Sequence, residues 1–276
     1  MKTLSDKQIA DKIMKQAKKF GADLCGIADV SDLKSAPSFI LAPQMPDSGK
    51  GVGSRQGKME LAPGEVSWPK TAKSVLVLAV AHPENKPEMD WWYGKKSPSG
   101  NRILMDAAKE LNEWIPENFG MDTIHLPYHV EHGGIYLKDA AVMAGLGCIG
   151  KNNMLLTPEF GPRVRLRALT LNISLPSNGP SDFDPCNECP VYCRKSCPQK
   201  AFKNRVFSKK DYSLDYLPGR NGYFSRPTCN VQMIEDNDVA DVEQLDSFEK
   251  PVSIIKYCRR CETACPVGKI KSEPEV

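Results

Sequence analysis

The sequence lacks long apolar runs, a secretory signal and a strong excess of either charge. No stretch approaches the roughly 18 consecutive apolar residues that a membrane-spanning helix needs. The opening residues, "MKTLSDKQIADKIMKQAKKFG", place lysines throughout the region that would be apolar in a signal peptide, and they contain no twin-arginine pair. A formal net charge of +3 over 276 residues gives no global field that would indicate nucleic acid as the partner. We therefore expect a cytoplasmic protein without a membrane partner.

Cysteine is scarce in the first two thirds of the chain and abundant in the last third. Cys25 and Cys148 stand alone, whereas the other eight cysteines lie between residues 186 and 265. A cytoplasmic thiol pool keeps cysteines reduced, so we do not expect disulfides. The junction segment "LPSNGPSDFDP" at 175–185 separates the two parts, and its composition suits a linker or turn. We predict two domains, residues 1–175 and residues 176–276.

The front part alternates between strand-like and helix-like patterns. Apolar runs at 22–30 and 74–82, bounded by turn residues, predict buried strands. Helical spacing at 102–120 and 135–147 predicts two helices. The segment 163–173 alternates basic and apolar residues, which predicts a half-exposed strand whose arginines either meet solvent or contact an anionic ligand. This order is typical of a mixed α/β fold with helices packed on a sheet.

The eight late cysteines form two closely spaced runs and one isolated residue. The first run, "CNECPVYCRKSCP", and the second, "CRRCETACP", both end in Cys-Pro, and Cys229 lies between them. Bacterial two-cluster ferredoxins use a similar run twice, and the fourth cysteine of each run binds the other cluster. By that logic the chain holds two [4Fe–4S] clusters. The predicted ligands are Cys186, Cys189, Cys193 and Cys265 for one cluster and Cys197, Cys229, Cys258 and Cys261 for the other.

Structural zinc is the competing interpretation, because paired C-x2-C groups also form four-thiolate zinc sites. Runs of three and four cysteines that end in Cys-Pro favour clusters over zinc. The first run departs from the ferredoxin pattern by one extra residue between Cys189 and Cys193. A bulged loop would absorb that residue.

The glycine-rich segment "GLGCIG" at 145–150 matches the pattern G-x-G-x-x-G. A dinucleotide site needs a strand before these glycines and a helix after them. Here a predicted helix precedes the glycines, and a loop or strand follows. The sequence therefore argues against a dinucleotide site.

The segment "LKDAAVMAGLGCIGKNNMLLTPEFGPRVRLRALTLNI" at 137–173, followed by the cysteine pattern, resembles the epoxyqueuosine reductases and the reductive dehalogenases. The resemblance covers about residues 125–270. It implies an α/β (α+β) corrinoid-binding domain, related to the nitroreductase-like, B12-processing fold, joined to a ferredoxin-like module with two [4Fe–4S] clusters. It also implies a bound cobalamin that receives electrons through the clusters. The D-x-H-x-x-G motif of histidine-ligated corrinoid proteins is absent from the sequence.

The resemblance places the corrin against the glycine segment. Lys151 and Asn152 would bind corrin amides or phosphate, or would only form a turn, and Cys148 would be a contact or a small buried hydrophobe. The residues predicted to contact the cofactor are Gly145, Gly147, Cys148, Gly150, Lys151 and Asn152.

Glu131 is the candidate proton donor. Epoxyqueuosine reductases carry an aspartate a short distance before "AGLG", and counting back without gaps reaches Glu131 in "YHVEHGG". Its neighbours His129 and His132 would adjust its proton affinity, and we take Glu131 and His132 as the candidate catalytic residues. The alternative is that Glu131 caps a turn.

We carry two functional hypotheses. The first is an oxidoreductase that passes electrons through two clusters to cobalamin for reductive chemistry on a small molecule. The second is an electron-transfer protein that reduces a partner, such as a corrinoid protein, without a corrinoid of its own. Either would take electrons from a low-potential donor such as ferredoxin or flavodoxin. Full epoxyqueuosine reductases continue into helical repeats that help hold tRNA, whereas this chain ends at Val276, so we expect that tRNA is not the substrate.

Overall fold

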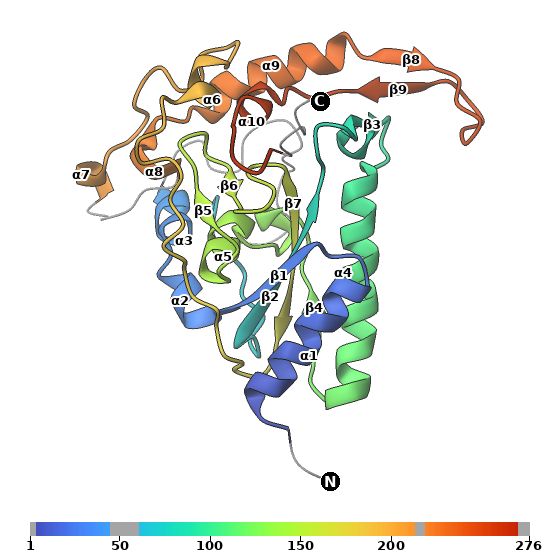
Figure 1. The fold of residues 1–276 in the computed structure, drawn as a ribbon, viewed down its shortest axis with the longest axis vertical. Coiled ribbons are helices and arrows are strands. Elements are labelled where there is room, and N and C mark those ends of the chain that lie inside the picture. The colour runs from blue at the N-terminus through green and yellow to red at the C-terminus, as the bar shows by residue number, and fades with distance from the viewer. Residues whose placement is uncertain (1–3, 45–60, 213–218, 270–276) are drawn as a thin grey trace, which may run out of the picture.

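A four-stranded antiparallel sheet lies at the centre of the front part (Figure 1). The computed structural model describes residues 4–44, 61–212 and 219–269. The sheet order is β1-β2-β7-β4, and every neighbouring pair is antiparallel. The predicted strands at 22–30 and 74–82 are confirmed. The four strands are β1 (Leu24–Asp29), β2 (Ser74–Ala81), β7 (Val164–Leu171) and β4 (Thr123–His125).

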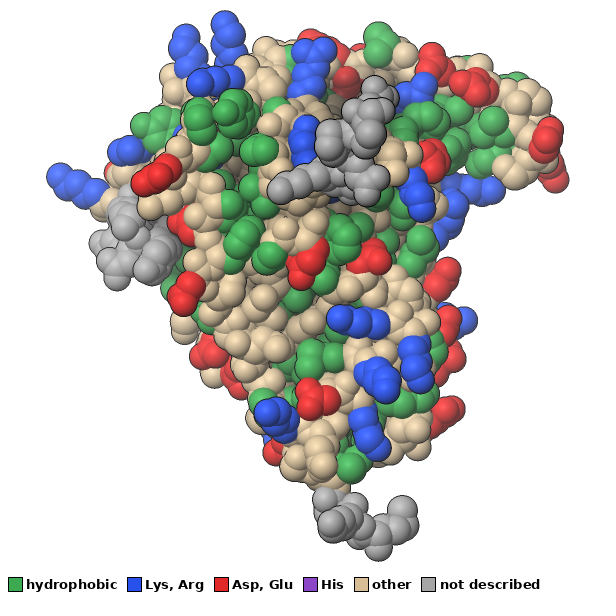
Figure 2. All heavy atoms as spheres, viewed as in Figure 1, with side chains coloured by type: hydrophobic (Ala, Val, Ile, Leu, Met, Phe, Trp, Pro, Cys, Tyr) green, Lys and Arg blue, Asp and Glu red, His purple; other side chains and the backbone are tan. Residues whose placement is uncertain are grey.

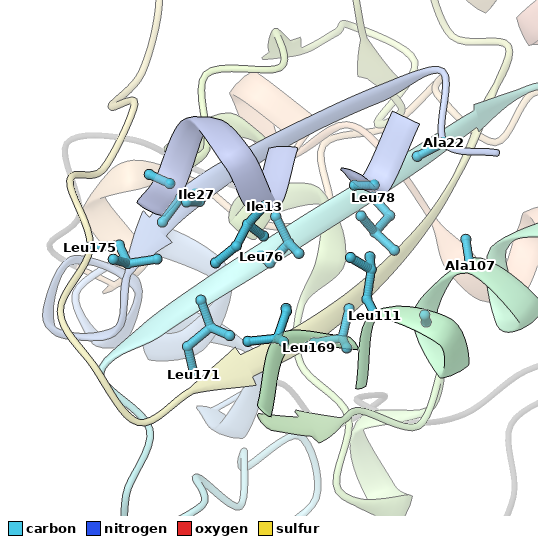
Figure 3. Packing of buried hydrophobic residues seen from close by; sticks show 14 of the residues in the cluster. Ile13, Ala22, Ile27, Leu76, Leu78, Ala107, Leu111, Leu169, Leu171 and Leu175 are labelled. Carbon is cyan, nitrogen blue, oxygen red and sulfur yellow. The ribbon is translucent and has the colours of Figure 1, made fainter. Parts of the chain in front are cut away.

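Helices cover both faces of this sheet. The helices α1 (Asp6–Lys19) and α4 (Ser99–Phe119) pack on one face, where Ile13 and Leu111 meet Leu76 and Leu169 (Figure 3). The helices α2 (Val30–Lys34) and α5 (Leu137–Met143) belong to the core on the other face. Alternate residues of β2 therefore enter different cores, which explains why every residue of the strand after Ser74 is apolar. Among the described residues, no helix combines the length and apolar character that crossing a bilayer requires.

The prediction of a half-exposed strand at 163–173 was wrong. β7 lies between β2 and β4, and seven of its eight residues are buried. Its arginines point into the protein: Arg167 is 7% exposed and lies over the ring of Tyr128, and Arg165 donates to the side chain of Asn101 and pairs with Asp90. Arg165 is therefore held by an ion pair and Arg167 by a cation–π contact, and the basic alternation does not mark a solvated edge.

The cysteine-rich part consists of short helices, one longer helix and a hairpin. The hairpin projects from one end of the molecule, and β3 of the front part adds to it in the order β3-β9-β8 (Figure 1). The elements are α6 (Tyr192–Lys195), α7 (Lys209–Tyr212), α8 (Gly219–Gly222), α9 (Arg226–Asp238), β8 (Asp241–Glu243), β9 (Val252–Ile255) and α10 (Arg260–Thr263). The remaining short elements are α3 (Pro37–Leu41), η1 (Ala42–Gln44), η2 (Pro87–Asp90), β3 (Trp92–Tyr93), η3 (Val130–His132), β5 (Cys148–Ile149) and β6 (Leu155–Leu156).

The start of the junction segment 175–185 is tied to the front sheet. The Asn178 side chain accepts a hydrogen bond from the backbone of Ile27 at 2.7 Å, and the Asn178 amide donates to the Ile27 carbonyl at 2.9 Å. The backbone of Leu175 donates to the hydroxyl of Ser74. The two Asn178 bonds satisfy the backbone N–H and C=O of Ile27 on the edge strand β1. This part of the junction is therefore anchored rather than a free linker.

Candidate functional site

The two cysteine runs and Cys229 meet beside the β5–β6 hairpin. Cys193 lies in α6, Cys261 in α10 and Cys229 in the first turns of α9. Ser225 caps α9 by accepting from the backbone of Thr228, and Asp236 of the same helix accepts from the backbone of Cys258 at 2.7 Å. Helix α9 thereby joins the isolated cysteine to the second run.

The first group of four thiols lines one cavity. Cys186, Cys189, Cys193 and Cys265 form its wall together with Leu156 of the hairpin. Three of the four thiols are buried, and Cys186 and Cys265 pack against Leu156. The fourth thiol of this cavity, Cys265, comes from the second run.

The second group contains the other four thiols: Cys197, Cys229, Cys258 and Cys261. Burial raises the pKa of Cys229, and the neighbouring thiols of Cys197 and Cys258 raise it further. Burial likewise raises the pKa of Cys261, and both Cys229 and Cys258 contribute to the rise. Cys193 of the first group also raises the pKa of Cys261, so the two groups are neighbours. The donor set of each group is four thiols, which is the set that a [4Fe–4S] cube requires.

Burial makes these thiols hold their protons in the absence of a bound group. Desolvation raises the pKa of Cys193 to about 11, and Cys265 and Cys186 add to it. Desolvation also raises the pKa of Cys265, against the backbone hydrogen bond from Val267 and the charge of Arg163. Because metal ligands must be thiolates, binding at either group releases protons. Within the described ranges, no three His, Cys, Asp or Glu side chains converge as they would on a single metal ion.

The residues predicted to contact the corrin instead connect the β5–β6 hairpin to the cysteine runs. The Lys151 ammonium donates to the carbonyl of Asn187 at 3.2 Å, and the buried Asn152 amide donates to the carbonyl of Cys261 at 3.4 Å. Cys148 pairs with Leu156 in the hairpin and packs against the first thiol group. A Cβ at Gly147 would lie 1.9 Å from the Leu156 carbonyl oxygen, so the hairpin closes only with glycine there.

The other two glycines also have structural roles. Gly145 follows the end of α5, and its amide donates to the carbonyl of Val142. Gly150 donates to the carbonyl of Met154 in the hairpin turn. The side chains and glycines that the sequence assigned to a corrin therefore make contacts within the protein that account for their positions.

Glu131 and His132 lie together in η3. The Glu131 carboxylate is 3.7 Å from Nδ1 of His129, and the rings of His129 and His132 are 5.9 Å apart and nearly perpendicular. All three side chains are partly exposed. The turn ends at Gly133, whose amide donates to the carbonyl of Val130. The structure thus brings together the carboxyl and imidazole groups that the sequence singled out.

A buried charged network, which sequence reasoning missed, joins the front part to the second cysteine run. Arg259 pairs with Glu262 and lies 3.6 Å from Asp90, which also pairs with Arg165. His82 is 3% exposed, and its Nδ1 lies 3.5 Å from Glu262 and 3.8 Å from Asp90. Burial and the nearby arginines lower the pKa of His82 to about 3, so these contacts are not ion pairs at neutral pH. The alternating arginines of β7, which include Arg165, were the sequence signal of this network.

Comparison with models of protein families finds no match. The chain is 23% identical over 277 aligned positions to an epoxyqueuosine reductase of Bacillus cereus, which covers 95% of this chain and 65% of the relative. It is 25% identical over 243 positions to a tetrachloroethene reductive dehalogenase of Desulfitobacterium hafniense, covering 79% of this chain and 43% of the relative. The chain spans about half to two thirds of the length of the epoxyqueuosine reductases that it matches.

Solved structures from both groups share the fold. A structure of epoxyqueuosine reductase with an epoxyqueuosine-modified tRNA-Tyr stem loop gives a TM-score of 0.61 at 19% identity, covering 96% of this chain and 66% of that one. A reductive dehalogenase described with a mechanism for B12-dependent dehalogenation gives 0.60 at 18% identity, covering 97% of this chain and 33% of that one. The mixed α/β fold that the sequence predicted is the fold of these enzymes.

The expectation that excluded tRNA was wrong. A structural neighbour that matches nearly the whole chain holds a tRNA stem loop, so the shared fold is compatible with that substrate class. The net charge of +3 does not exclude an anionic partner, because it is the sum over segments of opposite sign. Residues 186–226 contain nine Lys or Arg against three Asp or Glu, and residues 227–257 contain seven Asp or Glu against two Lys.

Sequence and structure agree on the relationship. The matches extend over both the front part and the cysteine-rich part, and they include enzymes of two kinds. The chain is similar in sequence to the epoxyqueuosine reductases and the reductive dehalogenases, and it shares their fold.

Proposed function

We propose that the chain is an iron–sulfur oxidoreductase in which two [4Fe–4S] clusters form a short electron path. The observation that carries this proposal is the division of eight thiols into two adjacent groups of four. Each group takes ligands from both parts of the cysteine-rich sequence, in the crossed arrangement of two-cluster ferredoxins. The names of the relatives, which are reductases, support the reaction class.

The chain's own residues perform defined tasks in this proposal. When bound, the clusters supply one-electron transfer. The thiol groups lose their protons as they bind iron, and the surrounding burial keeps water from the first group. Cys193 of the first group lies close enough to Cys261 of the second to raise its pKa, and this proximity would give electrons a short route between the groups.

Glu131 is proposed to hold the proton that the reduced substrate takes up. Its carboxyl group is partly exposed, so a substrate can reach it, and His129 beside it can supply a replacement proton. The substrate classes to test are those named by the relatives, an epoxide-bearing tRNA nucleoside and a halogenated small molecule.

A cobalamin acceptor is supported by a relative whose dehalogenation is described as B12-dependent. The second candidate function, electron transfer to a separate corrinoid protein, is favoured by a specific observation. Lys151, Asn152 and Cys148, which were predicted to hold the corrin, contact the cysteine-rich part instead.

Metal and cofactor analysis of anaerobically purified protein tests these proposals. Two clusters require about eight iron and eight sulfide per chain. About two zinc per chain without sulfide would overturn the oxidoreductase proposal. After reconstitution with cobalamin, bound corrinoid absorbance supports the enzyme, whereas full cluster content without corrinoid binding supports the electron-transfer protein. Turnover of an epoxyqueuosine-containing tRNA stem loop and of tetrachloroethene, each with reduced methyl viologen, then identifies the substrate class.

A further inference from the structure

The loop before β7 is pressed directly against the end of the second cysteine run. Gly161 has a φ of +58°, and a Cβ there would lie 2.0 Å from the carbonyl oxygen of Val267. No side chain larger than hydrogen fits between the two backbones. This contact places the following residue pair, Pro162 and Arg163, beside Cys265.

Arg163 binds the backbone on both sides of Cys265. One nitrogen of its guanidinium, Nη1, donates to the carbonyls of Glu262 and Cys265, each at 3.3 Å, and Nη2 donates to the carbonyl of Val267. The residue is 3% exposed. A planar guanidinium with several donors suits three carbonyls that converge in this way, and a lysine would satisfy fewer of them.

The guanidinium is also a buried charge close to a predicted cluster ligand. Its nearest acidic partner, Glu84, is 3.6 Å away and 40% exposed, so water screens much of that carboxylate's compensating charge. The guanidinium lies close to Cys265, because its Nη1 donates to the backbone carbonyl of that residue at 3.3 Å. A cluster becomes more negative when it accepts an electron, and a fixed positive charge nearby stabilises that reduced state.

We propose that Arg163 is a positioning residue for the cluster that includes Cys265, and that its charge raises the reduction potential of that cluster. The inference rests on the proposed function, since it requires a cluster at this group. Arg163 immediately precedes β7, so its hydrogen bonds attach the segment around Cys265 to a central strand of the front sheet.

Redox titration of three variants, followed by electron paramagnetic resonance, tests the inference. Arg163→Gln removes the charge and keeps a donor, Arg163→Lys keeps the charge with fewer donors, and Arg167→Gln removes a buried charge from the same part of the chain beside Tyr128. We expect Arg163→Gln to lower the midpoint potential of one cluster and Arg163→Lys to restore most of the shift. Arg167→Gln should leave both potentials unchanged. The same shift should appear in a Cys229→Ser background, where the other cluster is impaired.

Iron content separates the inference from the proposed function. Parent protein without iron and sulfide contradicts the proposed function itself. Parent and variants that all hold eight iron with equal potentials contradict only the role of Arg163. Loss of about four iron in Arg163→Gln, recovered in Arg163→Lys, supports positioning. Equal damage in both variants shows that the site tolerates no change and overturns the role of the charge.

Discussion

Cys25 illustrates how burial alone can make a cysteine inert. Its thiol donates to the carbonyl of Met14 at 3.3 Å, and burial raises its pKa to about 11 although Lys18 acts in the opposite direction. About one thiol in a thousand is then ionised at pH 8. We expect iodoacetamide at pH 8 to leave Cys25 unmodified in the folded protein and to modify it in urea, as measured by peptide mass spectrometry. Rapid alkylation of Cys25 in folded protein would contradict the burial argument.

The substitution Glu131→Gln tests whether Glu131 is the proton donor. Glu131→Gln preserves the shape of the side chain and removes its proton, so turnover of the accepted substrate should fall by the roughly 10²–10⁴-fold that general acid catalysis contributes. Iron and sulfide content should not change, because the carboxyl group lies outside both thiol groups. Parental turnover in Glu131→Gln would move the role to His129 or His132. Loss of cluster content instead would identify Glu131 as a structural cap.

Helix α9 holds Cys229 and the backbone of Cys258 in place for the second thiol group. It carries Cys229 to the second run, and Asp236 on the same helix fixes the backbone of Cys258. We expect Cys229→Ser to reduce iron from about eight toward about four per chain, because one cube loses a ligand. Cys148→Ser is the matched control: Cys148 packs beside the first thiol group but is not among the predicted ligands. Equal iron loss in both variants would refute the division into two groups.

The elements also show what the sequence could and could not reveal. β1 and β2 were predictable because a short apolar run bounded by turn residues is typical of a buried strand. The burial of β7 was not, because the partners of its arginines are remote in sequence: Asp90 is 75 residues from Arg165. The cysteine groups were predictable from spacing, since the same chemistry recurs in ferredoxins. Arg163 was not, because its acceptors are backbone carbonyls, which carry no sequence signal.

At the scale of the whole molecule, basic and acidic residues are concentrated in different segments of the cysteine-rich part. Lysine and arginine side chains gather over α6 and α7 (Figure 2), and the exposed members include Lys195, Lys200, Lys203, Arg205 and Lys210. The acidic segment 227–257 follows along α9 and the β8–β9 hairpin. A net charge close to zero therefore says little about which surfaces attract an anionic partner.

The buried network around His82 makes the free energy of unfolding depend on pH. The pKa of His82 is lowered to about 3 in the folded protein, chiefly by burial and then by Arg259 and Arg165, against about 6.5 in an unfolded chain. Between these values the unfolded chain binds one proton that the folded protein does not. The free energy of unfolding therefore falls as pH falls below about 6.5, by up to about 1.4 kcal/mol per pH unit, and His82 has no such effect above that pH.

His82→Gln removes this titration, and its comparison with the parent isolates it from the carboxyl groups of the same network. Between pH 7 and pH 5, the parent should lose about 2 kcal/mol more stability than the variant, even if the variant is less stable at pH 7. Urea unfolding under anaerobic conditions, followed by tryptophan fluorescence at pH 7, 6 and 5, measures both slopes. Parallel slopes would mean that His82 accepts a proton in the folded protein. In that case Glu262, 3.5 Å from its Nδ1, would stabilise the charged imidazole strongly enough to outweigh burial.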